Sequence, residues 1–148
     1  MTPINRTEIT LALAGNPNSG KSTIFNELTG AHQHVGNWPG VTVERKEGAA
    51  HLKSQKFRVE DLPGIYSLSA YTQEEVVARN FLLDGSVDVI VNVVDASNLE
   101  RNLYLTTQLL ELGLPVIVVL NMVDVAENMG QRIDMDKFAS LMGVEVIP

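Results

Sequence analysis

The feature that most constrains this sequence is the segment Leu11–Leu28, LALAGNPNSGKSTIFNEL, where an apolar run meets a glycine-rich loop and then a helical pattern. Ile9–Ala14 is short and apolar and ends at a glycine, which is typical of a buried strand. Ser22–Leu28 reads as a helix that begins at the loop. The sequence therefore predicts a strand, a tight loop and a helix in immediate succession, as in α/β folds.

The rest of the chain alternates between strand and helix signals. Further strands are predicted at Thr42–Leu52, Phe57–Asp61, Val87–Val94, Pro115–Leu120 and Val144–Ile147. Further helices are predicted at Glu74–Leu83, along the apolar stripe Leu99, Leu103, Thr106 and Leu110, and at Asp134–Leu141. The first two of these strands form a hairpin that turns near Lys53–Gln55, and Gly30–Gly40 is predicted to be an irregular loop. This alternation predicts a mostly parallel sheet with helices on both faces and ligands at the carboxyl ends of the strands.

Composition excludes several classes of protein. The 148 residues are enough for one domain with a sizeable core, and a net charge of −7 disfavours a nucleic-acid partner. The chain contains no cysteine, so it forms no disulfide. No apolar run approaches the ~20 residues that span a bilayer, and the N-terminus lacks a signal-peptide core. We expect the chain as given to be soluble and cytoplasmic.

The loop after the first strand matches the phosphate-binding pattern GxxxxGK[ST]. Its residues are Gly15, Asn16, Pro17, Asn18, Ser19, Gly20, Lys21 and Ser22. Glycines let successive N–H groups point inward, the helix N-terminus adds partial positive charge, and Lys21 adds a full charge. Ser22 offers a hydroxyl to a magnesium ion. A plain glycine turn is the alternative, but the full pattern in this setting favours a nucleoside triphosphate.

Three weaker signals follow in order. Thr42 can place its hydroxyl on magnesium and its amide on the terminal phosphate, although alone it is an ordinary strand residue. In the DxxG stretch, Asp61 can reach the magnesium shell through water and Gly64 can turn an N–H toward the terminal phosphate. After the strand PVIVVL, Asn121 precedes Asp124, whose carboxylate can accept two hydrogen bonds from guanine but not from adenine. The bland alternative for that pair is a strand-end turn or helix cap.

These motifs resemble the ordered set of Ras-like, more narrowly Era-like, GTPases. The sequence is similar to the N-terminal G domain of the bacterial ferrous iron transporter family FeoB in four stretches. These stretches are GNPNSGKST, VGNWPGVTVERKEG, DLPGIYSL and NVVDASNLERNLYLTTQLLELG. The resemblance implies a three-layer Ras-like α/β fold, with a mostly parallel sheet, one antiparallel edge strand and an end before the last helix. Residues 1–148 would be a GTP-binding domain fragment that regulates iron uptake at the cytoplasmic face of the inner membrane, and the family's helical and membrane domains would be its partners.

The resemblance also assigns roles by position. The nucleotide GTP or GDP would contact Gly15, Asn16, Pro17, Asn18, Ser19, Gly20, Lys21, Ser22, Thr23, Val41, Thr42, Asp61, Leu62, Pro63, Gly64, Asn121, Met122, Val123 and Asp124. Magnesium would be held by Ser22 and Thr42, with Asp61 in its shell. Val35–Val41 would belong to the first switch and Leu62 to about Glu75 to the second. Catalysis would rest on Lys21, Thr42, Gly64 and Asn18.

The sequence departs from the Ras pattern at two positions. Ile65 stands where Ras-like enzymes place a water-orienting glutamine, so slow intrinsic hydrolysis is expected. Met122 replaces the lysine of the usual NKxD motif. Glu74 and Glu75 are candidates for orienting the attacking water, with solvated charges at a helix start as the alternative.

Asn18 suggests a potassium-activated enzyme. In related GTPases the matching asparagine ligates a monovalent cation beside the β- and γ-phosphates, helped by first-switch carbonyls, for which Gly36–Trp38 is the candidate here. Such an ion would offset charge as an arginine finger does. The alternative is that Asn18 only hydrogen-bonds within its loop.

Other readings stay open at this point. A free-standing Era-like GTPase of ribosome or tRNA maturation is the second hypothesis, and a P-loop ATPase or small-molecule kinase is the third. His32 and His34 supply too few ligands for a tight metal site. The sequence leaves open whether the domain forms a homo-oligomer.

Overall fold

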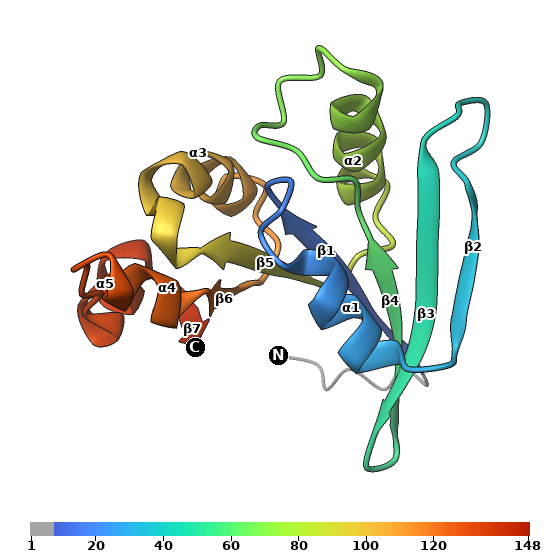
Figure 1. The fold of residues 1–148 in the computed structure, drawn as a ribbon. Coiled ribbons are helices and arrows are strands. Elements are labelled where there is room, and N and C mark those ends of the chain that lie inside the picture. The colour runs from blue at the N-terminus through green and yellow to red at the C-terminus, as the bar shows by residue number, and fades with distance from the viewer. Residues whose placement is uncertain (1–7) are drawn as a thin grey trace.

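One sheet of seven strands organises the computed structural model, which describes residues 8–148 (Figure 1). Its strands are β1 (Glu8–Gly15), β2 (Gln33–Asn37), β3 (Glu44–Leu52), β4 (Gln55–Asp61), β5 (Val89–Asp95), β6 (Val116–Asn121) and β7 (Glu145–Ile147). Its helices are α1 (Lys21–Thr29), α2 (Gln73–Leu83), the 3₁₀ turn η1 (Ala96–Asn98), α3 (Leu99–Leu110), α4 (Val123–Asn128) and α5 (Met135–Met142). Of the helices in residues 8–148, none combines the length and the apolar character needed to cross a membrane.

The strand order is β2-β3-β4-β1-β5-β6-β7. β1 lies between β4 and β5 and is parallel to both, and the parallel pairing continues through β6 to β7. β3 runs antiparallel to β4, so the predicted hairpin is confirmed. The predicted α/β class with a mostly parallel sheet is also confirmed. Because parallel strands end at the same side, the loops after β1, β4 and β6 meet at one rim.

The prediction that Gly30–Gly40 is an irregular loop is wrong for its centre. Gln33–Asn37 forms β2, which pairs antiparallel with β3 and makes the sheet edge in its place. Every residue of β2 is exposed. Because no side chain of β2 is buried, its sequence lacks the alternation of apolar and polar residues that predicts a strand. Main-chain pairing with β3 alone defines β2.

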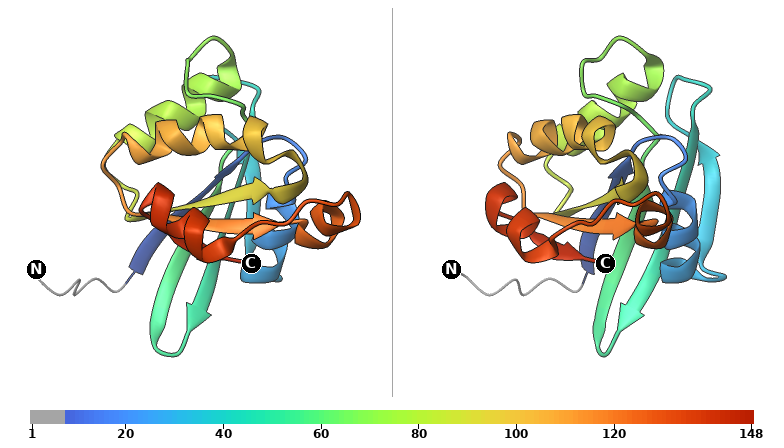
Figure 2. Two further views of the ribbon diagram at one scale, coloured as in Figure 1. Left: turned by 90° about the vertical axis from the view of Figure 1, so that its left-hand side faces the viewer. Right: turned by 60° about the vertical axis from the view of Figure 1, so that its left-hand side comes forward.

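Helices cover both faces of the sheet, as predicted. Leu13 of β1 packs with Phe25 of α1 and Val59 of β4 on one face. Its neighbours Ala12 and Ala14 join the larger cluster on the other face, which includes residues of α2 and α3. Figure 2 shows the same arrangement, with α2 and α3 along one side of the sheet and α1 on the opposite side. The alternation along β1 thus divides the core into two layers.

A buried polar network links the central strands to α3. The Thr106 hydroxyl donates to the Asn92 side-chain oxygen at 2.6 Å, and the Asn92 amide donates to the Ala14 carbonyl at 3.2 Å. Asn92 and Thr106 are buried, so each polar group finds a partner inside the core. The network fixes α3 relative to the end of β1, just before the phosphate-binding loop.

Gly48 tests how tightly α1 packs on the sheet. A Cβ atom at this position of β3 would lie 2.8 Å from the His32 carbonyl oxygen and against the Thr29 side chain. We expect Gly48→Ala to lower the free energy of unfolding by about 1–3 kcal/mol, because backbone must move to accept the methyl group. Urea denaturation measures the change.

Gly36 provides the matched control on the neighbouring strand. A Cβ there would meet no atom within 4 Å. Gly36→Ala should therefore leave the free energy of unfolding within about 0.5 kcal/mol of the wild type. Equal losses for the two variants would contradict the packing described here.

Candidate functional site

The loop between β1 and α1 presents an uncapped helix N-terminus. Gly20, the residue before α1, has a φ of 93°, a left-handed conformation that suits glycine. No side chain caps the first turn of α1. The free N–H groups and the helix dipole of this turn therefore favour an anion at the loop.

Lys21 and Asp61 form a buried ion pair at the centre of the site. Lys21 Nζ donates to Asp61 Oδ1, and both side chains are almost fully buried. Lys21 is the first residue of α1 and Asp61 is the last residue of β4, so the contact joins the phosphate loop to the DxxG stretch. The sequence predicted phosphate for Lys21 and the magnesium shell for Asp61, and the structure places the two groups side by side.

Asn121 ties the end of β6 to the same loop. Its side-chain amide donates to the Ser19 carbonyl at 3.0 Å. A Cβ atom on Gly20 would overlap the Asn121 amide, so glycine is required there for space as well as for its φ. Met122 adopts a left-handed conformation with a φ of 59°, which turns the chain sharply from β6 into α4.

The DxxG stretch continues along β1 and reaches the phosphate loop. The Leu62 N–H donates to the Leu13 carbonyl and the Ile65 N–H donates to the Gly15 carbonyl, both at 3.0 Å. Gly64 then lies so close to Pro17 that a Cβ atom would come within 3.0 Å of the Pro17 Cα. Ile65 is buried in the core cluster and takes no polar role.

These contacts enclose a cavity of about 470 Å³ at the sheet rim. The cavity is lined by Asn16, Pro17, Asn18, Gly20, Lys21, Ser22, Gly64 and Met122. Val41, Thr42 and Asp124 do not belong to this lining, and Thr42 and Asp124 are exposed. The structure thus brings together the phosphate loop and Gly64, while the predicted first switch and Asp124, the carboxylate predicted to read guanine, lie outside the cavity.

Among the described residues, three of the four buried side-chain polar atoms without a partner belong to the phosphate loop. The four are both side-chain polar atoms of Asn16, the Ser19 hydroxyl and the Trp38 indole N–H. Leaving such a group unpaired costs about 1–3 kcal/mol. Asn16 lines the cavity and is only 2% exposed, so the loop carries hydrogen-bonding capacity that the described chain does not use.

Asn18 is the exposed asparagine of the same loop. It adopts a left-handed φ of 64°, which is uncommon outside glycine. Its side chain makes no hydrogen bond to residues 8–148. The alternative that Asn18 serves only to hydrogen-bond within its loop therefore finds no support in the described structure.

The other candidate catalytic groups are engaged elsewhere. Glu75 accepts hydrogen bonds from Ser67 and Thr72 and belongs to the N-terminal cap of α2, and Glu74 is exposed. Gly36 and Asn37 pair with β3. None of these residues lines the cavity, so each would reach it only after a rearrangement of its segment.

A charged cluster beside Asp61 escaped the sequence analysis. The Glu60 carboxylate is fully buried and accepts hydrogen bonds from Arg45 at 2.6 Å and from Arg58 at 2.7 Å. The Arg45 guanidinium lies 4.4 Å from the centre of the Trp38 ring, which meets the Phe81 ring of α2 edge-on. This chain of contacts links the first switch to α2 and to the end of β4. Only strand register aligns these residues, so no local pattern could have found them.

Burial raises the pKa of the Glu60 carboxyl above its ordinary value, although Arg45 and Arg58 act in the opposite direction. For Glu47, burial also raises the pKa, but the charges of the same arginines outweigh it and the net pKa is lowered. The folded state therefore binds the Glu60 proton more tightly than the unfolded chain does, and the Glu47 proton less tightly.

The contributions of Glu60 and Glu47 to the free energy of unfolding are expected to change with pH in opposite directions. Stability from Glu60 is complete below the unfolded pKa and is lost as pH rises through the raised folded value. We expect the difference in unfolding free energy between wild type and Glu60→Gln to shrink as pH rises above the ordinary carboxyl pKa of about 4.5. The difference for Glu47→Gln should instead shrink as pH falls below about 4.5, through the lowered pKa of the folded state. Urea titrations at several pH values measure both, and a Glu60→Gln difference that grows with pH would contradict this assignment.

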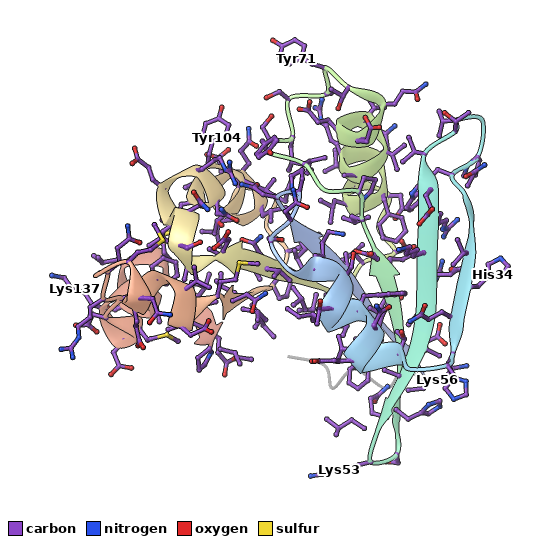
Figure 3. All side chains as sticks on the ribbon, in the orientation of Figure 1. His34, Lys53, Lys56, Tyr71, Tyr104 and Lys137 are labelled. Atoms are coloured by element: carbon purple, nitrogen blue, oxygen red, sulfur yellow. The ribbon has the colours of Figure 1, made fainter. Side chains whose placement is uncertain are left out.

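Two other features do not form a ligand site of the predicted kind. The larger cavity at residues 96–103 and 131–133, about 960 Å³, lies away from the phosphate loop. Within residues 8–148 no group of three or more His, Cys, Asp or Glu side chains is placed to hold a metal ion. His34 projects outward from β2 (Figure 3).

Comparison with known proteins identifies close relatives of this fold and site. A family model for ferrous iron transport protein B matches residues 9–148. The Fe(2+) transporter FeoB of Salmonella typhimurium is 54% identical over 145 residues, which are 95% of this chain and 19% of that protein. The chain thus spans about a fifth of that relative's length.

Solved structures agree with this result. A GDP-bound mutant of the S. thermophilus NFeoB protein superposes with a TM-score of 0.88 at 56% identity, covering 93% of this chain and 54% of that one. The G domain of the T. maritima FeoB iron transporter superposes with a TM-score of 0.87 at 41% identity, covering 94% and 85%.

Proposed function

The chain belongs to the ferrous iron transport protein B family, as a member of its N-terminal P-loop GTPase domains, and we propose that it binds and hydrolyses GTP as a switch that regulates ferrous iron uptake. The single observation that carries the proposal is the cavity at the sheet rim. Its lining unites the uncapped turn of α1, the ammonium group of Lys21 and the close approach of Gly64. The GDP-bound relative supports a guanine nucleotide as the ligand.

Lys21 and the loop N–H groups bind the β- and γ-phosphates in this proposal. The ammonium group of Lys21 exchanges its contact with Asp61 for phosphate oxygens, which carry more charge. Gly64 turns its N–H toward the γ-phosphate, and its lack of a side chain permits the approach past Pro17. These groups stabilise the charge that builds on the oxygens during phosphoryl transfer.

The residues present fit a magnesium ion. Ser22 offers an exposed hydroxyl in the cavity wall, and Asp61 supplies a carboxylate that contacts Lys21, the residue before Ser22. Thr42 would join them when the first switch closes. A bound magnesium ion supplies positive charge at the β- and γ-phosphates. The contact between Lys21 and Asp61 holds the ammonium group and the carboxylate at the rim of the sheet before the nucleotide binds.

The attacking water is held by main-chain groups in this proposal. Ile65 is buried and Glu75 caps α2, so neither side chain is placed for this role, and the exposed Glu74 would reach the cavity only after its segment rearranges. The Gly64 N–H and the main chain around Thr42 are the remaining donors and acceptors. Slow intrinsic hydrolysis follows from the absence of a polar side chain at Ile65.

Loss of the γ-phosphate would release Gly64 and Thr42 and let both switches relax. In the full-length relatives the chain corresponds to about a fifth of the protein, so the helical and membrane domains of its own polypeptide are the proposed receivers of this change. The proposed location is the cytoplasmic face of the bacterial inner membrane. The 54% identity to named Fe(2+) transporters favours this role over ribosome or tRNA maturation.

Asp124 tests the preference for guanine. We expect Asp124→Ala to weaken GDP binding by about 100-fold, because two hydrogen bonds to a charged acceptor are lost, while ATP stays a poor competitor. Calorimetry with GDP measures the change. Glu127→Ala, which removes another exposed carboxylate from the same helix, should leave the affinity within twofold (about 0.4 kcal/mol). Equal losses would contradict guanine readout by Asp124.

Asn18 tests the proposed monovalent cation. Its exposed, unpaired amide fits an oxygen ligand for potassium, which would supply charge beside the β- and γ-phosphates. We expect wild-type GTP turnover to be about 10-fold or more faster in potassium than in sodium, and Asn18→Ala to turn over GTP slowly in both salts. Single-turnover phosphate release measures both rates. Equal wild-type rates in the two salts would remove the cation from the mechanism.

A further inference from the structure

All three tyrosines of the sequence are exposed on one region of the molecule. Tyr66 and Tyr71 lie in the segment between β4 and α2, and Tyr104 lies on α3. They are 49%, 91% and 59% exposed, respectively. Figure 3 shows Tyr71 and Tyr104 projecting from the same side of the molecule. Trp38, Phe25 and Phe81, in contrast, are buried in the core. Exposed tyrosines gathered in this way are typical of protein interfaces.

The segment that carries Tyr71 is anchored at both ends. The Leu68 N–H donates to the Gln108 side-chain oxygen of α3 at 2.7 Å, and Thr72 caps α2 through the Glu75 N–H. Between these anchors Ala70 adopts a left-handed φ of 63°. That conformation costs of order 1 kcal/mol in a residue with a side chain. The anchored, strained turn holds Tyr71 away from the core.

Tyr66 already contacts a guanidinium group in this structure. The guanidinium of Arg101 on α3 lies 5.3 Å from the centre of the Tyr66 ring. This is the geometry of a cation–π contact, in which the positive group lies over the ring face. Within residues 8–148, neither Tyr71 nor Tyr104 has a cation or a ring stacked on it.

An exposed carboxylate lies three or four positions in sequence from each of the two unoccupied rings. Glu100 precedes Tyr104 by four positions on α3, so the two side chains share a helix face. Glu74 lies in the first turn of α2, three residues after Tyr71. A ring face with a carboxylate at its edge suits a guanidinium, which stacks through its plane and donates from its rim.

We propose that the face formed by Tyr71, Glu74, Glu100 and Tyr104 docks a basic segment of a protein partner, with arginines stacked on the two tyrosines and paired with the two carboxylates. Charge complementarity selects this occupant. The chain carries a net charge of −7, and the face holds two carboxylates against the one guanidinium of Arg101, so a basic segment is favoured over a second copy, an anionic lipid surface or a nucleic acid. The segment between β4 and α2 carries both Gly64 of the proposed nucleotide site and Tyr71 of this face. Docking of the basic segment does not itself depend on GTP hydrolysis.

A nonapeptide of arginine is the probe. Calorimetry at low salt on the GDP-loaded protein should show binding that weakens about 10-fold in the double variant Tyr71→Ala, Tyr104→Ala. The double variant Tyr71→Phe, Tyr104→Phe should retain the wild-type affinity because the ring faces remain. Circular dichroism checks that every variant is folded.

Matched substitutions of carboxylates distinguish binding of the peptide at this face from non-specific electrostatic binding to an acidic protein. Glu74→Gln with Glu100→Gln should weaken binding about as much as loss of the rings. Glu27→Gln with Glu145→Gln removes two exposed carboxylates elsewhere and should change the affinity less than twofold. Equal weakening by the two glutamine pairs, or unchanged binding after loss of the rings, would overturn the proposal.

Discussion

The ion pair between Lys21 and Asp61 is the interaction around which the site is built. Lys21 opens α1 and Asp61 closes β4, so one contact holds the phosphate loop against the end of the neighbouring strand. Two opposite charges can be buried together because each satisfies the other, whereas either alone would be costly. The pair therefore joins the loop to β4 and holds two charged groups at the proposed phosphate site.

The same rim concentrates features that a fold built only for stability would avoid. Asn18 and Met122 adopt left-handed conformations, and the side chains of Asn16 and Ser19 are buried without partners in the described chain. Strain and unpaired polar groups each cost free energy, and the surrounding packing must offset them. Their position at the ends of β1 and β6 coincides with the proposed nucleotide site.

Coupling beyond the rim runs through side chains from distant segments. Trp38 of the first switch contacts Arg45, which binds the buried Glu60 next to Asp61. Phe81 of α2 packs on the same tryptophan. Trp38, in the predicted first switch, is thus in direct contact with α2 through Phe81 and is linked through Arg45 to Glu60, the residue before Asp61.

The sequence alone determined the α/β class, the hairpin, the phosphate loop and the family, because each depends on local spacing: the apolar runs, GxxxxGKS and NxxD. Only the tertiary structure decided the rest. β2 is held by main-chain pairing and leaves no side-chain pattern, and α4 is too short to show one. The Arg45–Glu60 cluster and the tie from Asn121 to Ser19 join residues 15 and 102 positions apart. Such contacts depend on strand register and chain crossing, which no short stretch of sequence encodes.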